Sequence, residues 1–175
     1  MIIKNTKLVL QNRGVGKKYH DMSLTDYPHT QAEVIKTWLE KEANKHLQEG
    51  KGVILFSVKH EGYDLAMLTA RALILSGYTK LKTIDFNFCM EDEVLAEIGA
   101  EKPPLLITNF FPDASFVNPE KYKRLETIIN YYIDNCIPVI LHIPAEHNGP
   151  KQEYGPLISP VLLDRLEKDS KIFAI

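Results

Sequence analysis

Short apolar runs alternate with amphipathic segments along most of the chain, a pattern typical of an α/β domain with a mostly parallel sheet. The runs that predict buried strands are GVILF (52–56), KLKTIDFNFC (80–89), PPLLITNFF (103–111), PVILHI (138–143) and KIFAI (171–175). The segments that predict helices between and after them are 64–78, 90–100, 118–136 and 161–167. Right-handed crossovers would place these helices on both faces of a sheet of about five strands.

The first part of the chain has a weaker pattern. Residues 1–22 are polar, with basic side chains at Arg13, Lys17 and Lys18 and glycines nearby, so we expect an arm or a short pairing strand. A helix is predicted from about Thr30, because Val34, Trp38 and Leu39 recur at helical spacing. Trp38 is expected in the core. We therefore divide the chain into a lead-in, residues 1–22, and one domain, residues 23–175.

Composition excludes several classes of protein. A net charge of −2 and a pI near 6.3 argue against a generally basic nucleic-acid-binding surface, so we expect any DNA contact to be local and weak. Cys89 and Cys136 alone support neither a disulfide framework nor a cysteine-rich zinc site. The chain shows no signal peptide and no apolar run of membrane-spanning length. We expect a cytoplasmic protein.

Ligands of open parallel sheets bind outside the carboxyl ends of the strands, which points to residues 57–64, 87–90, 108–113 and 142–148. The first of these follows the strand-loop-helix layout of a phosphate-binding loop, G-x-x-x-x-G-K-[ST]. Here the loop reads SVKHEGYD, with Tyr63 and Asp64 at the positions of the lysine and the hydroxyl residue. The other loop residues considered as site candidates are Ser57, Lys59, His60 and Gly62.

The order of these segments resembles the AAA+ ATPase domain of replicative helicase loaders of the DnaC/DnaI type over nearly the whole chain. The segments that carry the resemblance are RGVGKKYHDMSLTDY (13–27), GKGVILF (50–56), LAMLTARALILSGY (65–78) and LLDRLEKD (162–169). The resemblance implies a P-loop NTPase-like, three-layer sandwich. It also places Arg165 at the position of the arginine finger of that family.

The departures from the family fall where its chemistry should be. The loop lacks the phosphate-binding lysine and the magnesium-binding hydroxyl, and Asp64 adds negative charge, which disfavours ATP by repulsion. The Walker B strand ends in Thr108 and Asn109 in place of two acids, and His142 follows where a polar sensor residue is expected. The resemblance therefore implies a pseudo-ATPase with no cofactor, whose vacated phosphate cradle Tyr63 could fill.

Other readings of the same residues stay open at this stage. The loop could be an ordinary turn with Asp64 as the helix N-cap. Ser57, His60 and Asp64 with His142 could suggest a hydrolase, although the G-x-S-x-G turn is missing. A metal site would draw on His142, Glu146 and His147, without H-E-x-x-H spacing.

Two further motifs have structural alternatives. Phe110 and Phe111 could stack on a base, against ordinary packing. Arg165 could be a surface residue paired with Asp164 or Glu167.

These observations predict a degenerate, non-hydrolysing, helicase-loader-like protein that acts through protein contacts in DNA replication, as an adaptor or inhibitor of loading. A phage or mobile-element source fits this interpretation. The expected partners are a helicase, an active helicase loader or a second copy of the chain, without a membrane. The alternatives are an enzyme that uses the pocket at the strand ends and a structural subunit of an assembly, because fold analogy alone does not decide function.

Overall fold

The computed structural model describes residues 2–28, 30–57, 61–110, 118–144 and 160–174. Five strands form one parallel sheet in the order β2-β3-β4-β1-β5. The strands are β1 (Gly52–Ser57), β2 (Lys82–Asp85), β3 (Leu105–Thr108), β4 (Val139–Pro144) and β5 (Ser170–Ala174). The predicted α/β fold with a parallel five-stranded sheet is confirmed.

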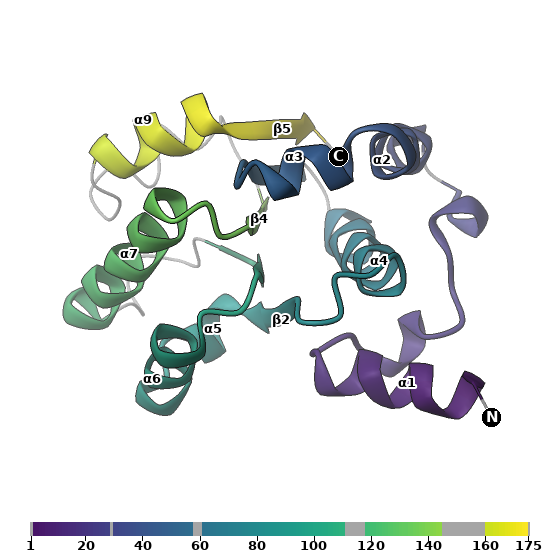
Figure 1. Cartoon of the computed structure of the whole chain (residues 1–175), viewed down its shortest axis with the longest axis horizontal. Coiled ribbons are helices and arrows are strands. Elements are labelled where there is room, and N and C mark those ends of the chain that lie inside the picture. Colours follow the sequence, from purple (N-terminus) through teal and green to yellow (C-terminus); the bar gives the residue numbers. More distant parts are fainter. Residues whose placement is uncertain (1, 29, 58–60, 111–117, 145–159, 175) are drawn as a thin grey trace.

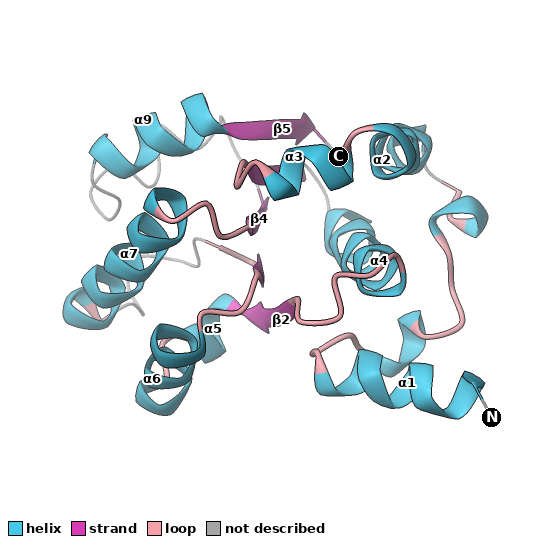
Figure 2. Cartoon of the chain, in the orientation of Figure 1, coloured by secondary structure: helices cyan, strands magenta, loops and turns pink. Residues whose placement is uncertain are grey.

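Helices cover both faces of this sheet (Figures 1 and 2). The α-helices are α1 (Ile2–Asn12), α2 (Thr30–Lys41), α3 (Ala43–Gln48), α4 (Glu61–Leu75), α5 (Phe86–Cys89), α6 (Asp92–Glu101), α7 (Pro119–Asp134) and α9 (Pro160–Asp169). Two short 3-10 helices, η1 (Lys17–Tyr19) and η2 (Leu24–Asp26), connect α1 to α2. In Figure 1, α1, α2 and α4 lie on one side of the sheet, and α6, α7 and α9 lie on the other.

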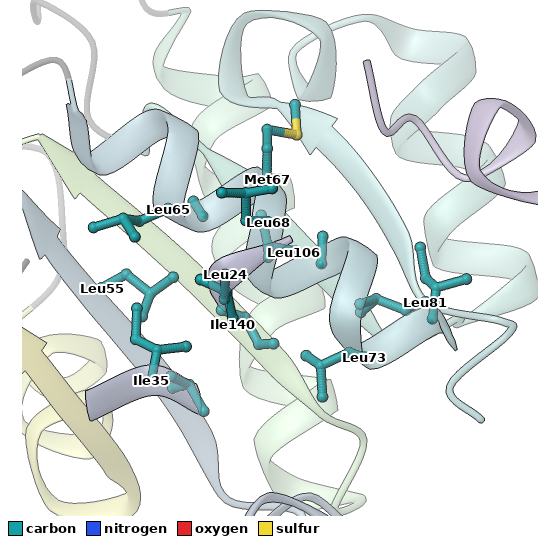
Figure 3. Close-up of a cluster of buried hydrophobic side chains, with 14 of the residues drawn as sticks. Leu24, Ile35, Leu55, Leu65, Met67, Leu68, Leu73, Leu81, Leu106 and Ile140 are labelled. Carbon is teal, nitrogen blue, oxygen red and sulfur yellow. The ribbon is translucent and has the colours of Figure 1, made fainter. Parts of the chain in front are cut away.

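Successive side chains of each strand point to opposite faces of the sheet, so the sheet contributes to two hydrophobic cores. Val53 and Leu55 of β1 pack with α2 and α4 on one face, whereas Ile54 packs with α6, α7 and α9 on the other. Figure 3 shows the first cluster, where Leu24 of η2 lies close to the side chains of α4 and of the strands. Trp38 is 2% exposed in this cluster, as predicted. A sheet buried on both faces leaves its carboxyl edge as the place where polar side chains meet.

Two details of the predicted elements are wrong. The apolar run 80–89 is a strand only as far as Asp85, because the Asp85 carboxylate accepts the Asn87 backbone N–H and begins α5. In α2 the buried face is formed by Ala32, Ile35 and Trp38, and Val34 is 48% exposed. The buried face of α2 is therefore rotated about the helix axis from the predicted face, which included Val34.

The N-terminal residues form a helix and not the predicted arm or pairing strand. Leu10 of α1 is fully buried, and α1 contacts α4. Beyond the helix, the carbonyl oxygen of Arg13 accepts a hydrogen bond of 2.7 Å from the backbone N–H of Thr83 in the edge strand β2. Gly14 permits this approach, since it has a φ of 82° and a Cβ there would lie 2.0 Å from the Thr83 oxygen. The segment thus covers the open edge of β2.

Within the part of the chain that the structure describes, no helix has the length and apolar character needed to cross a bilayer.

Candidate functional site

Four polar side chains meet at the carboxyl ends of β2, β3 and β4. Asp85 ends β2, and its carboxylate accepts a hydrogen bond of 2.7 Å from the Asn109 side chain and a longer one of 3.4 Å from the Thr108 hydroxyl. The backbone N–H of Asn109 donates to Nδ1 of His142 on β4 at 3.2 Å. We call Asp85, Thr108, Asn109 and His142 the strand-end cluster.

Asn109 links the cluster because its backbone adopts the left-handed conformation, with a φ of 50°. Asparagine tolerates this conformation better than most residues do. The turn lets the next residue return to the sheet, where the Phe110 N–H donates to the carbonyl oxygen of His142 at 2.9 Å. Asn109 therefore both shapes the chain and binds Asp85.

His142 is the most deeply buried titratable group of the cluster, at 1% exposure. Burial lowers the pKa of His142 to about 4, although the nearby Asp85 carboxylate acts in the opposite direction. The ring is thus neutral at pH 7. Its Nδ1 must be the unprotonated nitrogen, since it accepts the Asn109 N–H.

Tyr63 lies beside this cluster in the first turn of α4. Its ring is T-shaped to the His142 ring, with centroids 6.2 Å apart. Burial raises the pKa of Tyr63, and the Asp85 carboxylate raises it further. A neutral phenol therefore lies beside the strand-end cluster.

Side chains of the segment that precedes α2 bind the Asp64 carboxylate. This carboxylate accepts hydrogen bonds from Tyr19 at 2.5 Å and Tyr27 at 3.2 Å, and it forms an ion pair of 2.9 Å with Lys18. Burial raises the pKa of Asp64, but the hydrogen bonds from Tyr19 and Lys18 outweigh this effect and leave the pKa below its usual range. The alternative reading of Asp64 as a helix N-cap is wrong, because α4 begins at Glu61.

The remaining loop candidates are described only in part. Ser57 ends β1 opposite Pro144, and Gly62 is buried in the first turn of α4. Lys59 and His60 lie outside the described residues, as do Phe111, Glu146 and His147. Phe110 is fully buried, with its ring T-shaped to Phe86 at 5.3 Å, so it packs in the core and does not stack on a base.

The hydrolase and metal alternatives gain no support from the described residues. Asp64 is bound to Lys18 and two tyrosines, and His142 lies across the cluster on β4. Among the residues that the structure describes, no group of three histidine, cysteine or acidic side chains could hold a metal ion. His142 also has too little exposed surface to meet a substrate.

Arg165 contacts two side chains of the neighbouring helix α7. One guanidinium nitrogen donates to the Asn130 side chain at 2.8 Å, and the other forms a close ion pair with Asp134. Asp164, one of the two predicted partners, instead pairs with Lys168 at 2.6 Å. The Arg165 side chain is 28% exposed. It therefore ties α9 to α7 within one chain.

The sequence analysis missed Asp85. The predicted site residues after this strand begin at Asn87, because the run to Cys89 predicts one continuous strand. The pattern of an acid directly after the β-branched pair Thr83 and Ile84, followed by Asn87 as an N-cap partner, is a usable signal for the true strand end.

No family model matches the chain, and no curated protein matches it in sequence. Solved structures match it in fold. The DnaC helicase loader superposes with a TM-score of 0.67 at 13% identity, covering 91% of this chain and 99% of the loader. Domain III of the replication initiation protein DnaA from Thermotoga maritima gives a TM-score of 0.66 at 11% identity, over 92% of this chain and 68% of that one.

A protein from Streptococcus pyogenes serotype M3, described as a primosome component, gives a TM-score of 0.61 at 16% identity, over 95% of this chain and 94% of that one. The similarity to the loader extends over nearly the whole of both chains, as the co-linear segments predicted. At these identities the similarity concerns the fold alone. The chain has the AAA+-type P-loop NTPase fold found in the DnaC helicase loader.

Proposed function

We propose that this chain is a helicase-loader-like protein that acts through protein contacts in DNA replication without hydrolysing ATP. In this proposal residues 1–22 are a lead-in to one domain, residues 23–175, and the protein works in the cytoplasm. Its partner is a replicative helicase or an active helicase loader. The shared fold supports the direction of this proposal, and the chemistry of the strand ends supports the loss of hydrolysis.

The observation that carries the proposal is the use of the catalytic positions for contacts within the chain. Tyr63 packs on His142, and Asp64 is bound by Lys18, Tyr19 and Tyr27. Phosphate binding in this fold needs backbone N–H groups, a lysine charge and a hydroxyl that holds magnesium. A phenol and a carboxylate supply neither the lysine charge nor that hydroxyl.

The Walker B positions lead to the same conclusion. Two acids there would hold magnesium and orient the attacking water. Thr108 is fully buried, and it and Asn109 both donate to Asp85, so their polar atoms bridge two strands. Asp85 accepts from both the backbone N–H and the side-chain amide of Asn87 as well. An acid with four neutral donors around it is stabilised in place and does not need a metal ion.

Calorimetric titration with Mg-ATP tests the loss of nucleotide chemistry, with an active DnaC-type loader as positive control. We expect no heat of binding that corresponds to a dissociation constant below about 100 μM. A constant of about 1 μM, near −8 kcal/mol, would overturn this part of the proposal.

The protein-contact part has its own test. The tagged chain is mixed with the purified replicative helicase, and separately with the active loader, of its source organism. We expect a complex of at least one of these pairs by size-exclusion chromatography with light scattering, with unchanged assembly in the absence of ATP. If neither pair forms a complex and the chain forms a stable oligomer by itself, the structural-subunit alternative replaces the proposal.

A further inference from the structure

Residues 13–27 form a connection that lies along one face of α4, and we call this segment the strap. Three of its apolar side chains are buried in the core that faces α4, namely Val15, Tyr19 and Leu24, at 2%, 3% and 6% exposure. Both 3-10 helices of the strap contact α4. The strap is thus part of the fold and not a loose tail.

Polar contacts attach the strap to α4 at two points. Asp64 accepts from Lys18, Tyr19 and Tyr27, which come from both halves of the strap. Two turns further along α4, Nε of Arg71 donates to the carbonyl oxygen of His20 at 3.2 Å. Asp64 and Arg71 are seven residues apart and so share one face of the helix. Asp64 is the single acceptor on which three strap side chains converge.

Tyr63, the residue before Asp64, connects the same place to the strand-end cluster. Its ring lies 6.5 Å from the Tyr19 ring of the strap and 6.2 Å from the His142 ring of β4, measured between centroids. A continuous series of contacts therefore runs from the strap through Tyr19 and Tyr63 to His142 and Asn109.

We propose that Asp64 is a latch that holds the strap closed on α4, and that opening of the strap loosens the strand-end cluster through the adjacent Tyr63. Removal of this carboxylate takes away the acceptor that Lys18, Tyr19 and Tyr27 share, so both halves of the strap would lose a polar contact with α4 at once. Tyr63 and Asp64 share the first turn of α4, and a shift of that turn moves the Tyr63 ring away from His142. This device does not depend on the proposed function. It allows a molecule that binds the strap to alter the strand ends.

Amide hydrogen exchange of the full chain, measured by NMR, tests both parts of the proposal. Asp64→Ala removes the latch, and Tyr27→Phe removes one of its bonds with little change of shape. Asp21→Asn is the matched control, because Asp21 lies in the same strap but pairs with Lys7 at a carboxylate that is 76% exposed. The amides of Tyr19 and Tyr27 report on the strap. The amide of Asn109, which is bonded to His142, reports on the cluster.

We expect Asp64→Ala to accelerate exchange at least tenfold at Tyr19, Tyr27 and Asn109, while the amides of α7 and the fluorescence of Trp38 keep their wild-type values. Tyr27→Phe should give a smaller change at the same amides, and Asp21→Asn none. Local opening of this kind is distinct from global unfolding because the rest of the core stays protected.

Three results would overturn the proposal. Unchanged exchange of the strap amides in Asp64→Ala would show that Asp64 does not hold the strap on α4. Fast exchange in the strap with wild-type exchange at Asn109 would show that opening of the strap does not loosen the strand-end cluster. If Asp64→Ala accelerates every amide because the whole fold is weakened, Tyr27→Phe decides, and equal acceleration of the strap and of α7 in that variant would show that the strap does not open separately.

Discussion

The side-chain amide of Asn109 lies 2.7 Å from the Asp85 carboxylate and donates a hydrogen bond to it, which joins the carboxyl ends of two neighbouring parallel strands. An acid at position 109 would meet Asp85 directly. The asparagine at this position is therefore part of the stability of this chain.

The first prediction concerns the introduction of an acid at position 109. Asn109→Asp should lower the free energy of unfolding at pH 7 by about 1–3 kcal/mol, because it replaces a donor with a second carboxylate in a half-buried site. Urea unfolding followed by Trp38 fluorescence measures the change. Asn44→Asp is the control, since the Asn44 side-chain oxygen is an exposed acceptor for Tyr78. Equal losses of unfolding free energy in the two variants would show that the contact with Asp85 makes no specific contribution to stability.

The second prediction concerns pH. The folded pKa of His142 is about 4, below its unfolded value of 6.5, so the unfolded chain binds more protons between these two values. The contribution of His142 to stability is complete above pH 6.5 and is lost as the pH falls toward 4, by roughly 3 kcal/mol in total. His142→Asn, which keeps an acceptor but cannot titrate in this range, should flatten the stability profile between pH 4 and 6.5. Parallel profiles of wild type and variant would contradict the prediction.

The third prediction compares two glycines with a positive φ. At Gly14 a Cβ would lie 2.0 Å from the carbonyl oxygen of Thr83, whereas at Gly77, with a φ of 123°, nothing lies within 4 Å. Gly14→Ala should therefore cost about 2–4 kcal/mol of stability, and Gly77→Ala about 1–2 kcal/mol from backbone strain alone. Chemical denaturation of the two variants checks the difference. Similar losses would mean that the contact between residue 13 and β2 relaxes easily.

The fourth prediction concerns Arg165. Arg165→Ala should cost about 1 kcal/mol of stability, because it removes the tie from α9 to Asn130 and Asp134 on α7. Thermal unfolding measures this loss, with Lys168→Ala as the control for an exposed pair on the same helix.

The hypothesis that Arg165 acts as an arginine finger adds a second expected outcome for the same variant. An arginine donated to the site of an active neighbouring ATPase stabilises phosphoryl transfer there. Under this hypothesis Arg165→Ala lowers the ATPase rate of the active partner at least tenfold relative to the complex with wild-type chain, while Lys168→Ala does not. Equal rates would leave Arg165 as a tie between helices.

The elements that depend on local pattern could be predicted from the sequence. The apolar runs of β1, β3 and β4 and the strong period of α4 and α7 identify their structure, because burial on both faces of a sheet, or on one face of a helix, requires those residue types. The order of these elements implied the fold, since parallel strands joined by helices have few alternative arrangements. The unusual residues Tyr63 and Asp64 were also visible, because the phosphate-binding loop has a strict local spacing.

The partners of those residues were decided by the tertiary structure. Tyr19 reaches Asp64 across 45 positions of the chain, and Asp85, Asn109 and His142 meet only because three strands lie side by side. Their sequence distances carry no periodic signal, so pattern analysis left Asp85 unnoticed and read Asp64 as unbalanced charge. The sequence predicts an arm or a short pairing strand over residues 1–22 for the same reason, because the buried position of Leu10 depends on α4, more than 50 residues further along the chain. Hydrophobic period is a local property, whereas the balance of a charge or the burial of a short amphipathic helix depends on what the rest of the fold places beside it.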